Sequence, residues 1–182
     1  MALKIALIGA DSIGFTRTLL HDIVAVPELA NTMFAFTDIS SRNLEMVTQL
    51  CTRDLEANKL PAKIVATTVC RKAIADSDYV ICTIRQGGLE AFQTDIEIPL
   101  TYGVDQCVGD TICAGGIMYA QRTIPALLNV CKDIRKVAMS TLAELCEPSG
   151  HEHVGVQQVR KDQNDRSVSR GAGVTLADYQ VH

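Results

Sequence analysis

A glycine-framed turn near the start of the chain has residue types that bind phosphate. Gly9 and Gly14 bracket the run GADSIG, which follows an apolar run at 3–8 and precedes an apolar helical pattern. Between a strand and a helix, such glycines let backbone N–H groups approach a pyrophosphate at the positive end of the helix. The frame is imperfect, because Asp11 replaces the middle glycine and its carboxylate must repel phosphate or turn outward. Ser12 offers an additional hydroxyl donor.

A second candidate is Asp38, which ends the apolar run MFAFT at 33–37. A carboxylate there accepts hydrogen bonds from both hydroxyls of an adenosine ribose and repels the extra phosphate of NADP, which favours NAD. An alternative stays open, in which Asp11 or Ser12 caps a tight turn without a ligand and Asp38 caps the next helix. The candidate cofactor residues are Gly9, Ala10, Asp11, Ser12, Ile13, Asp38, Arg42, Ile84, Arg85 and Gln86.

The elements that must position these residues alternate between strand and helix. Short apolar runs predict strands at 3–8, 33–37, 63–67 and 79–84, and the last is apolar enough to lie buried on both faces. Helical patterns follow the first two strands, with Ser41 as the expected N-cap of the second helix, and a short helix is expected at 71–75. This order predicts an α/β fold with a Rossmann-like doubly wound parallel sheet, whose ligands lie outside the carboxyl ends of the strands. The first turn, Asp38 and residues 85–88 fall there.

A longer helix is expected at about 117–137, after Gly115 and Gly116, with a kink at Pro125. Together with the upstream motifs, this region resembles family 4 glycoside hydrolases. That family carries a GAGS-type turn, an aspartate ending the second strand, an IRQGG- or QVGG-like segment and the block D-T-x-G-P-G-G-I-x-x-A-L-R-T-I-P. Here they stand as GADS, Asp38, IRQGG and DTICAGGIMYAQRTIP. The resemblance covers residues 3–137, and plain lactate or malate dehydrogenases lack the last block.

The resemblance implies a glycoside hydrolysis outside the usual two-carboxylate scheme. NAD takes a hydride from sugar C3, a divalent metal such as Mn²⁺ polarises the ketone, and a base removes the C2 proton. The aglycone then leaves C1, water adds and the hydride returns. The implied partners are a small sugar substrate and, in the full-length family, further copies in a homo-oligomer.

Three polar residues, Asp110, Thr111 and Arg122, are placed near the sugar, since carboxylates and guanidinium groups bind hydroxyls. The alternative is that Asp110 caps the long helix and Arg122 forms a structural ion pair. No residue is assigned as a catalytic group or a metal ligand.

Smaller signs favour the α-galactosidase branch of the family, whose substrates are unphosphorylated. Phe92 stands where phospho-glycosidases of the family carry an arginine for the sugar phosphate, and GVDQCVGDT with GGIM is more similar to the α-galactosidases. The alternatives are α-glucosidase, α-glucuronidase or 6-phospho-glycosidase members, or a non-catalytic NAD-binding remnant.

The resemblance stops after residue 137. There the family has a strand with the motif L-N-Y-x-N-P-x-A-M-N-T, whereas this chain reads AELCEPSGHEH at 143–153. Suitable codons for these residues, read one base later, encode LNYVNPVAMN and the start of a threonine codon. We therefore expect a frameshift, with residues 1–137 as the NAD-binding domain, 138–182 as an aberrant disordered tail, a truncated sheet and no glycosidase activity from this chain alone. Sequencing the coding DNA tests this hypothesis, and codons unable to yield the motif would refute it.

Composition excludes several other classes. The net charge is −4 and aromatic residues make up 4% of the chain, so nucleic-acid binding is not expected. No run approaches the roughly 18 apolar residues of a membrane span, and no secretory signal precedes the first strand, so a cytoplasmic protein without membrane contact is expected. The seven cysteines contain no C-x-x-C pair, which indicates small buried side chains rather than disulfides.

Overall fold

A computed structural model describes residues 3–106, 113–137, 141–146 and 153–158 of the chain. Its centre is a sheet with the strand order β3-β2-β1-β4-β5-β6. The strands are β1 (Lys4–Ile8), β2 (Met33–Thr37), β3 (Lys63–Ala66), β4 (Tyr79–Cys82), β5 (Thr141–Cys146) and β6 (His153–Gln158). The pairings among β1 to β5 are parallel, and β6 pairs antiparallel with β5. The predicted α/β class and Rossmann-like doubly wound sheet are confirmed.

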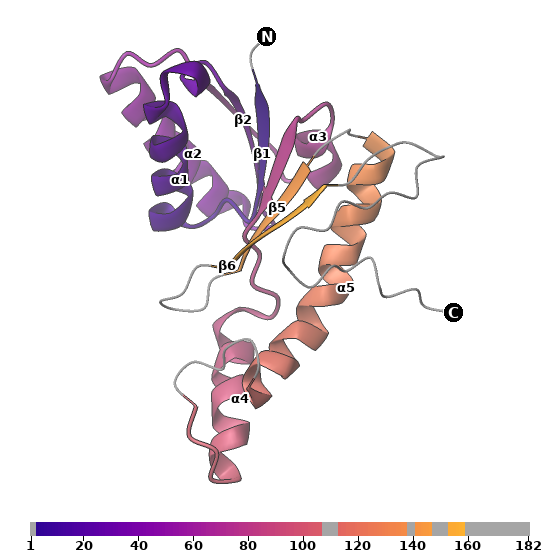
Figure 1. Cartoon of the computed structure of the whole chain (residues 1–182). Coiled ribbons are helices and arrows are strands. Elements are labelled where there is room, and N and C mark those ends of the chain that lie inside the picture. Colours follow the sequence, from indigo (N-terminus) through magenta and orange to yellow (C-terminus); the bar gives the residue numbers. More distant parts are fainter. Residues whose placement is uncertain (1–2, 107–112, 138–140, 147–152, 159–182) are drawn as a thin grey trace.

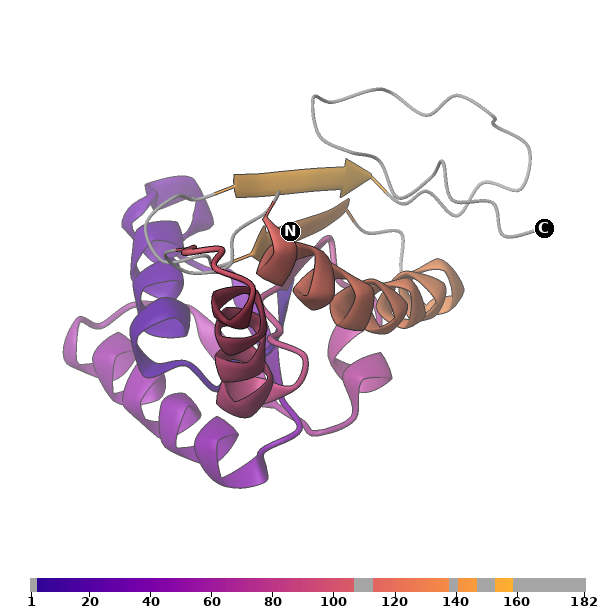
Figure 2. The same cartoon turned by 90° about the horizontal axis from the view of Figure 1, so that it is seen from below.

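Helices cover both faces of this sheet. On one side lie α1 (Ile13–Ala25) and α2 (Ser41–Ala57), and on the other α3 (Cys70–Ile74) and the second half of α5 (Ala114–Val137) (Figure 1 and Figure 2). A short 3₁₀ turn, η1 (Pro27–Leu29), separates α1 from β2. The predicted elements up to residue 82 are therefore present, each within a few residues of its expected bounds. The second helix begins one residue earlier than predicted, because Ser40 rather than Ser41 is its N-cap and accepts from the Asn43 amide at 3.3 Å.

Alternation along the strands divides the buried side chains into two cores. The β2 side chains Phe34 and Phe36 pack with Leu7 on the α1–α2 side, while Ala35 faces the α3–α5 side. The second core holds Ile74 of α3 and Ile134 of α5 against the sheet. Apolar side chains on both faces explain why β1 and β2 have nearly continuous apolar sequences.

The helix α4 (Gly88–Thr101) was not expected from the sequence, and it lies away from the sheet. It packs beside the first half of α5 and, together with it, extends beyond the carboxyl ends of the strands (Figure 1). We call α4 and residues 114–124 of α5 the arm. The helix α5 begins at Ala114, so the two glycines predicted to precede it lie in its first turn, and it continues through Pro125.

The structure differs from the sequence analysis after residue 137. There the sequence predicts an irregular tail, whereas 141–146 form β5 and 153–158 form β6, with Thr141 opposite Tyr79 of β4. A free strand edge presents unpaired N–H and C=O groups that can bond to many sequences, so side-chain periodicity is a weak guide there. The other residues of 138–182 lie outside the described part of the chain, and the domain boundary at 137 stays a prediction.

No helix in the described ranges is long and apolar enough to cross a membrane. Five cysteines have side chains that the structure describes, and none of them is in a disulfide; Cys51 and Cys82 are fully buried, while Cys70, Cys113 and Cys131 are partly exposed. The prediction of small buried thiols is therefore right for two of these five.

Native Cys51 is expected to resist alkylation. It is 0% exposed, and burial, followed by the nearby Asp54 carboxylate, raises the pKa of its thiol to about 11. At pH 8 only about one molecule in a thousand then carries the reactive thiolate. Iodoacetamide labelling followed by peptide mass spectrometry should find Cys51 modified only in urea, with the partly exposed Cys113 as the internal control. Equal native labelling of the two would contradict the burial.

Candidate functional site

The candidate site lies at the carboxyl ends of β1, β2 and β4. The strand order reverses here, since β1 has β2 on one side and β4 on the other. In open parallel sheets a ligand binds in the crevice at such a reversal. The first turn and Asp38 lie on the β1–β2 side, and residues 84–88 follow β4, so the topology brings both groups of candidate residues to one edge of the sheet.

Gly9 makes the turn after β1, and the surrounding backbone allows no larger residue. Its φ of +84° is in the left-handed region, and a Cβ there would lie 2.7 Å from the Thr83 carbonyl oxygen. Its amide donates to the Thr37 carbonyl at 2.9 Å, and the Thr83 hydroxyl donates to its carbonyl at 2.9 Å. The turn is therefore fixed between the ends of β2 and β4. Ala10, which follows, is 0% exposed and bonds to the same Thr37 carbonyl.

Ser12 is the N-cap of α1. Its hydroxyl oxygen accepts from the Phe15 amide at 3.2 Å, so the alternative role as a helix cap is present. An accepting hydroxyl keeps its own proton, so capping leaves the predicted donor available. Ile13, the first residue of α1, is 52% exposed on the same turn.

Asp38 lies just before α2, but Ser40 is the N-cap of that helix, so the capping role that the alternative interpretation gave to Asp38 is wrong. Its Oδ1 accepts from the Ser40 amide at 2.7 Å, at the start of α2. Burial raises the pKa of Asp38 above its ordinary value, the Ser40 amide opposes this, and the Asp11 carboxylate adds a smaller increase. The carboxylate therefore both orders the entry into α2 and remains a partly exposed acceptor.

Asp11 is exposed, and its Oδ2 accepts from Asn43 Nδ2 of α2 at 3.4 Å. This contact holds the carboxylate toward the first turn of α2, on the β2 side of the edge. Arg42 lies exposed in the same turn. The Asp11 carboxylate is also near enough to Asp38 to raise the pKa of that residue, and its outward turn from a phosphate stays a prediction.

After β4 the chain forms a loop at 84–88 against the arm. The Arg85 guanidinium carbon lies 4.8 Å from the centroid of the Phe92 ring of α4 and 5.8 Å from that of Tyr119 of α5. The Tyr119 hydroxyl donates to the Ile84 carbonyl at 3.2 Å. The carbonyl of Gln86 accepts from Arg122 of α5.

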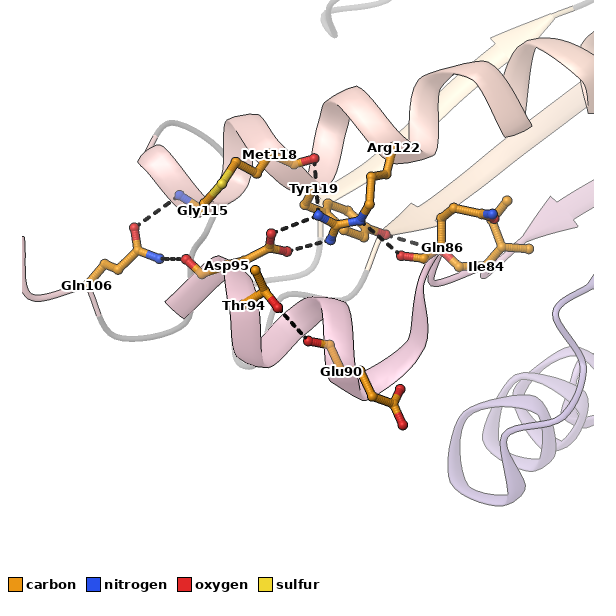
Figure 3. Close-up of polar contacts among 10 residues, drawn as sticks. All are labelled: Ile84, Gln86, Glu90, Thr94, Asp95, Gln106, Gly115, Met118, Tyr119 and Arg122. Carbon is orange, nitrogen blue, oxygen red and sulfur yellow. Dashed lines mark hydrogen bonds and ion pairs between the residues drawn. The ribbon is translucent and has the colours of Figure 1, made fainter. Parts of the chain in front are cut away.

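Arg122 makes the structural ion pair that the sequence analysis kept as an alternative to sugar binding. Its Nη1 and Nη2 reach Asp95 Oδ1 and Oδ2 at 2.8 and 2.5 Å, and Asp95 is 2% exposed (Figure 3). The hydrogen bond with Asp95 raises the pKa of Arg122 above its ordinary value. Its Nε also donates to the Gln86 carbonyl at 3.4 Å. Asp110 and Thr111, the other two predicted sugar residues, lie outside the described residues.

Sequence reasoning missed Asp95, Gln106 and Tyr119. Gln106 Nε2 donates to the Asp95 carbonyl at 2.8 Å, and its Oε1 accepts from the Gly115 amide at 3.1 Å (Figure 3). No local spacing connects these residues, because α4 and α5 meet only in the folded arm. The described part of the chain also holds no group of three His, Cys, Asp or Glu side chains suited to a metal, so no residue here is assigned to Mn²⁺.

A family model described as family 4 glycosyl hydrolase matches residues 4–150. The chain belongs to family 4 of the glycosyl hydrolases. It is 59% identical over 135 residues to an α-galactosidase of Rhizobium meliloti, covering 74% of this chain and 28% of that protein. An α-galactosidase of Bacillus subtilis is 35% identical over 136 residues, with 74% of this chain and 31% of that protein covered.

A solved family 4 structure has the same fold. The 6-phospho-β-glucosidase of Thermotoga maritima, solved with manganese, NAD⁺ and glucose-6-phosphate, superposes with a TM-score of 0.71 at 28% identity, over 82% of this chain and 36% of that one. The chain thus spans about a third of the length of these relatives. The resemblance inferred from the sequence motifs is confirmed.

Proposed function

We propose that this chain binds NAD across the β1–β4 crevice and forms the cofactor-binding part of a family 4 α-galactosidase. The proposal rests mainly on the Gly9 turn, which is fixed against Thr37 and Thr83 in a conformation that leaves no room for a Cβ. This brings the backbone at the start of α1 to the place where a pyrophosphate would lie. Asp38, with its partly exposed carboxylate, is the ribose acceptor beside it.

The residues present fit this cofactor from one end to the other. On the adenosine side stand the first turn and Asp38, with Asp11 and Arg42 at the start of α2. On the nicotinamide side stand Ile84, Arg85 and Gln86, at the other side of the strand reversal. When bound, the nicotinamide supplies a reversible hydride acceptor for the C3 carbon of a sugar. The protein residues bind and orient it, and exclude the NADP phosphate by charge.

The identity to the Rhizobium meliloti α-galactosidase supports an unphosphorylated α-galactoside as the substrate of the full-length protein. Phe92 agrees with this proposal, because its ring packs against Arg85 and offers no cation to a sugar phosphate. Since the chain covers about a third of its relatives, hydrolysis with a divalent metal such as Mn²⁺ is proposed for a polypeptide of their full length. Asp110 and Thr111 remain the proposed sugar contacts.

Calorimetric titration of the purified chain tests the cofactor proposal. We expect saturable binding of NAD, with NADP binding at least about 10-fold more weakly because its extra phosphate meets the carboxylate of Asp38. AMP should bind weakly at the adenosine side. A chain that gives a native circular dichroism spectrum and yet binds neither NAD nor AMP would refute the proposal.

A further inference from the structure

Asp95 is an almost fully buried acid in the arm, which lies away from the sheet. An acid at this depth is costly unless both of its oxygens are paired, and Arg122 satisfies both through a bidentate contact between α4 and α5 (Figure 3). Simple attachment of one helix to another needs no buried charge, because apolar residues of similar volume often do this as well. The use of a charged pair at this place therefore suggests a second task.

The other contacts of Arg122 indicate what that task is. Its Nε donates to the Gln86 carbonyl, and a Cβ on Gly87 would lie 3.3 Å from the same Nε. The third donor atom, Nη1, reaches the carbonyl of Met118 in addition to Asp95. All three guanidinium nitrogens thus donate within the protein, and one of them holds the backbone of the loop at 84–88.

The backbone of Asp95 makes a second connection. Its carbonyl accepts from Gln106, which in turn accepts from the Gly115 amide in the first turn of α5. The Gln106 side chain therefore connects the backbone of α4 at Asp95 to the backbone of α5 at Gly115 (Figure 3). Asp95 thus contacts Arg122 through its side chain and Gln106 through its backbone carbonyl, and Arg122 in turn contacts the loop after β4.

The stacking of Arg85 depends on the same two helices. Its guanidinium lies over Phe92 from α4 and Tyr119 from α5, one turn or less from Asp95 and Arg122 respectively. Opening the contact between the helices would separate these two rings. It would also leave Arg122 without the partner that orients it toward the Gln86 carbonyl. The hydrogen bond from the Tyr119 hydroxyl to the Ile84 carbonyl would then have to hold the loop to α5.

We propose that Asp95 is a positioning residue that orients Arg122 and through it fixes the nicotinamide-side loop at 84–88, while Gln106 ties the Asp95 backbone to the first turn of α5. This inference rests on the proposed NAD site. It reassigns Arg122 from sugar binding to positioning, and it predicts that Asp95 acts on one half of the cofactor only. The adenosine half lies on the other side of the strand reversal, where Gly9 bonds to Thr37 and Thr83 and Asp38 bonds to Ser40.

The test compares NAD with AMP in the variant Asp95→Asn, which keeps the shape of the side chain and removes its charge. We expect the NAD dissociation constant to rise about 10-fold or more, because Arg122 loses the partner that orients it, while the AMP constant stays within about 2-fold. Calorimetry measures the NAD dissociation constant, and ligand-observed NMR at millimolar AMP measures the AMP dissociation constant. Arg122→Lys should give the same pattern, since an amine cannot bridge both oxygens and the loop.

The chain offers a matched control in Asp133, which pairs with Arg71 at 2.8 Å from the same helix α5 but lies away from the site. Asp133→Asn should leave both dissociation constants unchanged. Equal weakening of NAD and AMP binding by Asp95→Asn would show that Asp95 has a merely structural role. Unchanged NAD binding would show that Asp95 has no role in cofactor binding. Either result overturns the inference. If that variant does not fold, Arg122→Lys decides on the same criteria. Failure of the unaltered chain to bind NAD would instead refute the proposed function and this inference with it.

Discussion

Replacing Gly9 with alanine is expected to abolish detectable NAD binding and to destabilise the fold by about 2–4 kcal/mol. The added Cβ would stand 2.7 Å from the Thr83 carbonyl oxygen, at a φ of +84° that alanine rarely adopts. Neither Thr83 nor Gly9 can move away without losing a hydrogen bond, because the Thr83 amide donates to the Ile8 carbonyl at 2.8 Å and the Gly9 amide donates to the Thr37 carbonyl. The strain would push the turn away from β4 and displace the start of α1. Urea unfolding and NAD calorimetry measure the two effects.

Gly14 provides the control for this substitution, since it is the other glycine of the sequence frame. A Cβ on Gly14 meets nothing within 4 Å, and the residue lies in the first turn of α1. Gly14→Ala should therefore leave the free energy of unfolding unchanged or raise it by up to about 1 kcal/mol, through better helix propensity. If the two variants were equally stable, the steric argument for Gly9 would be wrong.

Replacing Asp38 with asparagine is expected to change cofactor preference more than stability. The amide oxygen can still accept from the Ser40 amide, so the entry into α2 is kept. Loss of the charge should weaken NAD about 10-fold, because hydrogen bonds to a charged acceptor are stronger than to a neutral one, and strengthen NADP by about 10-fold. The preference for NAD would then fall about 100-fold. Parallel titrations with NAD and NADP give both numbers.

In the unaltered chain the same charge makes NAD binding depend on pH. Burial raises the pKa of Asp38, so as the pH is lowered the carboxylate is protonated, and NAD affinity falls, at a higher pH than for an exposed aspartate.

The control for Asp38→Asn is Asp78, whose Oδ2 accepts from the Lys4 amide at 2.8 Å at the opposite end of β1. Asp78→Asn removes the charge of a carboxylate that likewise accepts from a backbone amide, and it should leave the NAD-to-NADP ratio as it was. A ratio shifted equally by both variants would count against Asp38 as the ribose acceptor.

The sheet could be predicted from the sequence because its signals are local. Each of the first four strands is a short apolar run with a turn or polar residue at its end, and parallel strands place those ends at one edge. Gly9 and Asp38 were found for this reason, since both are adjacent in sequence to the strands that position them. The boundary of α2 was wrong by one residue because two serines, Ser40 and Ser41, are chemically equivalent as caps until the backbone conformation is known.

The arm could not be predicted in the same way. Asp95 and Arg122 are 27 residues apart on two different helices, and nothing in the spacing of the chain distinguishes this acid from the other acids on α4. The sequence marks Arg122 as a candidate because guanidinium groups often bind ligands, but its partner Asp95 is defined only by the contact between the two folded helices. Strands β5 and β6 were missed for a different reason, since backbone pairing at a sheet edge leaves little trace in side-chain pattern.

The arm also has an energetic consequence. Within the described residues, its outer helix α4 contacts α5, and neither core of the sheet includes an α4 side chain. Segments of this kind open locally at a free energy well below that of global unfolding. The nicotinamide half of the crevice would therefore lose its order first on warming or mild denaturation, while the adenosine half persisted with the sheet.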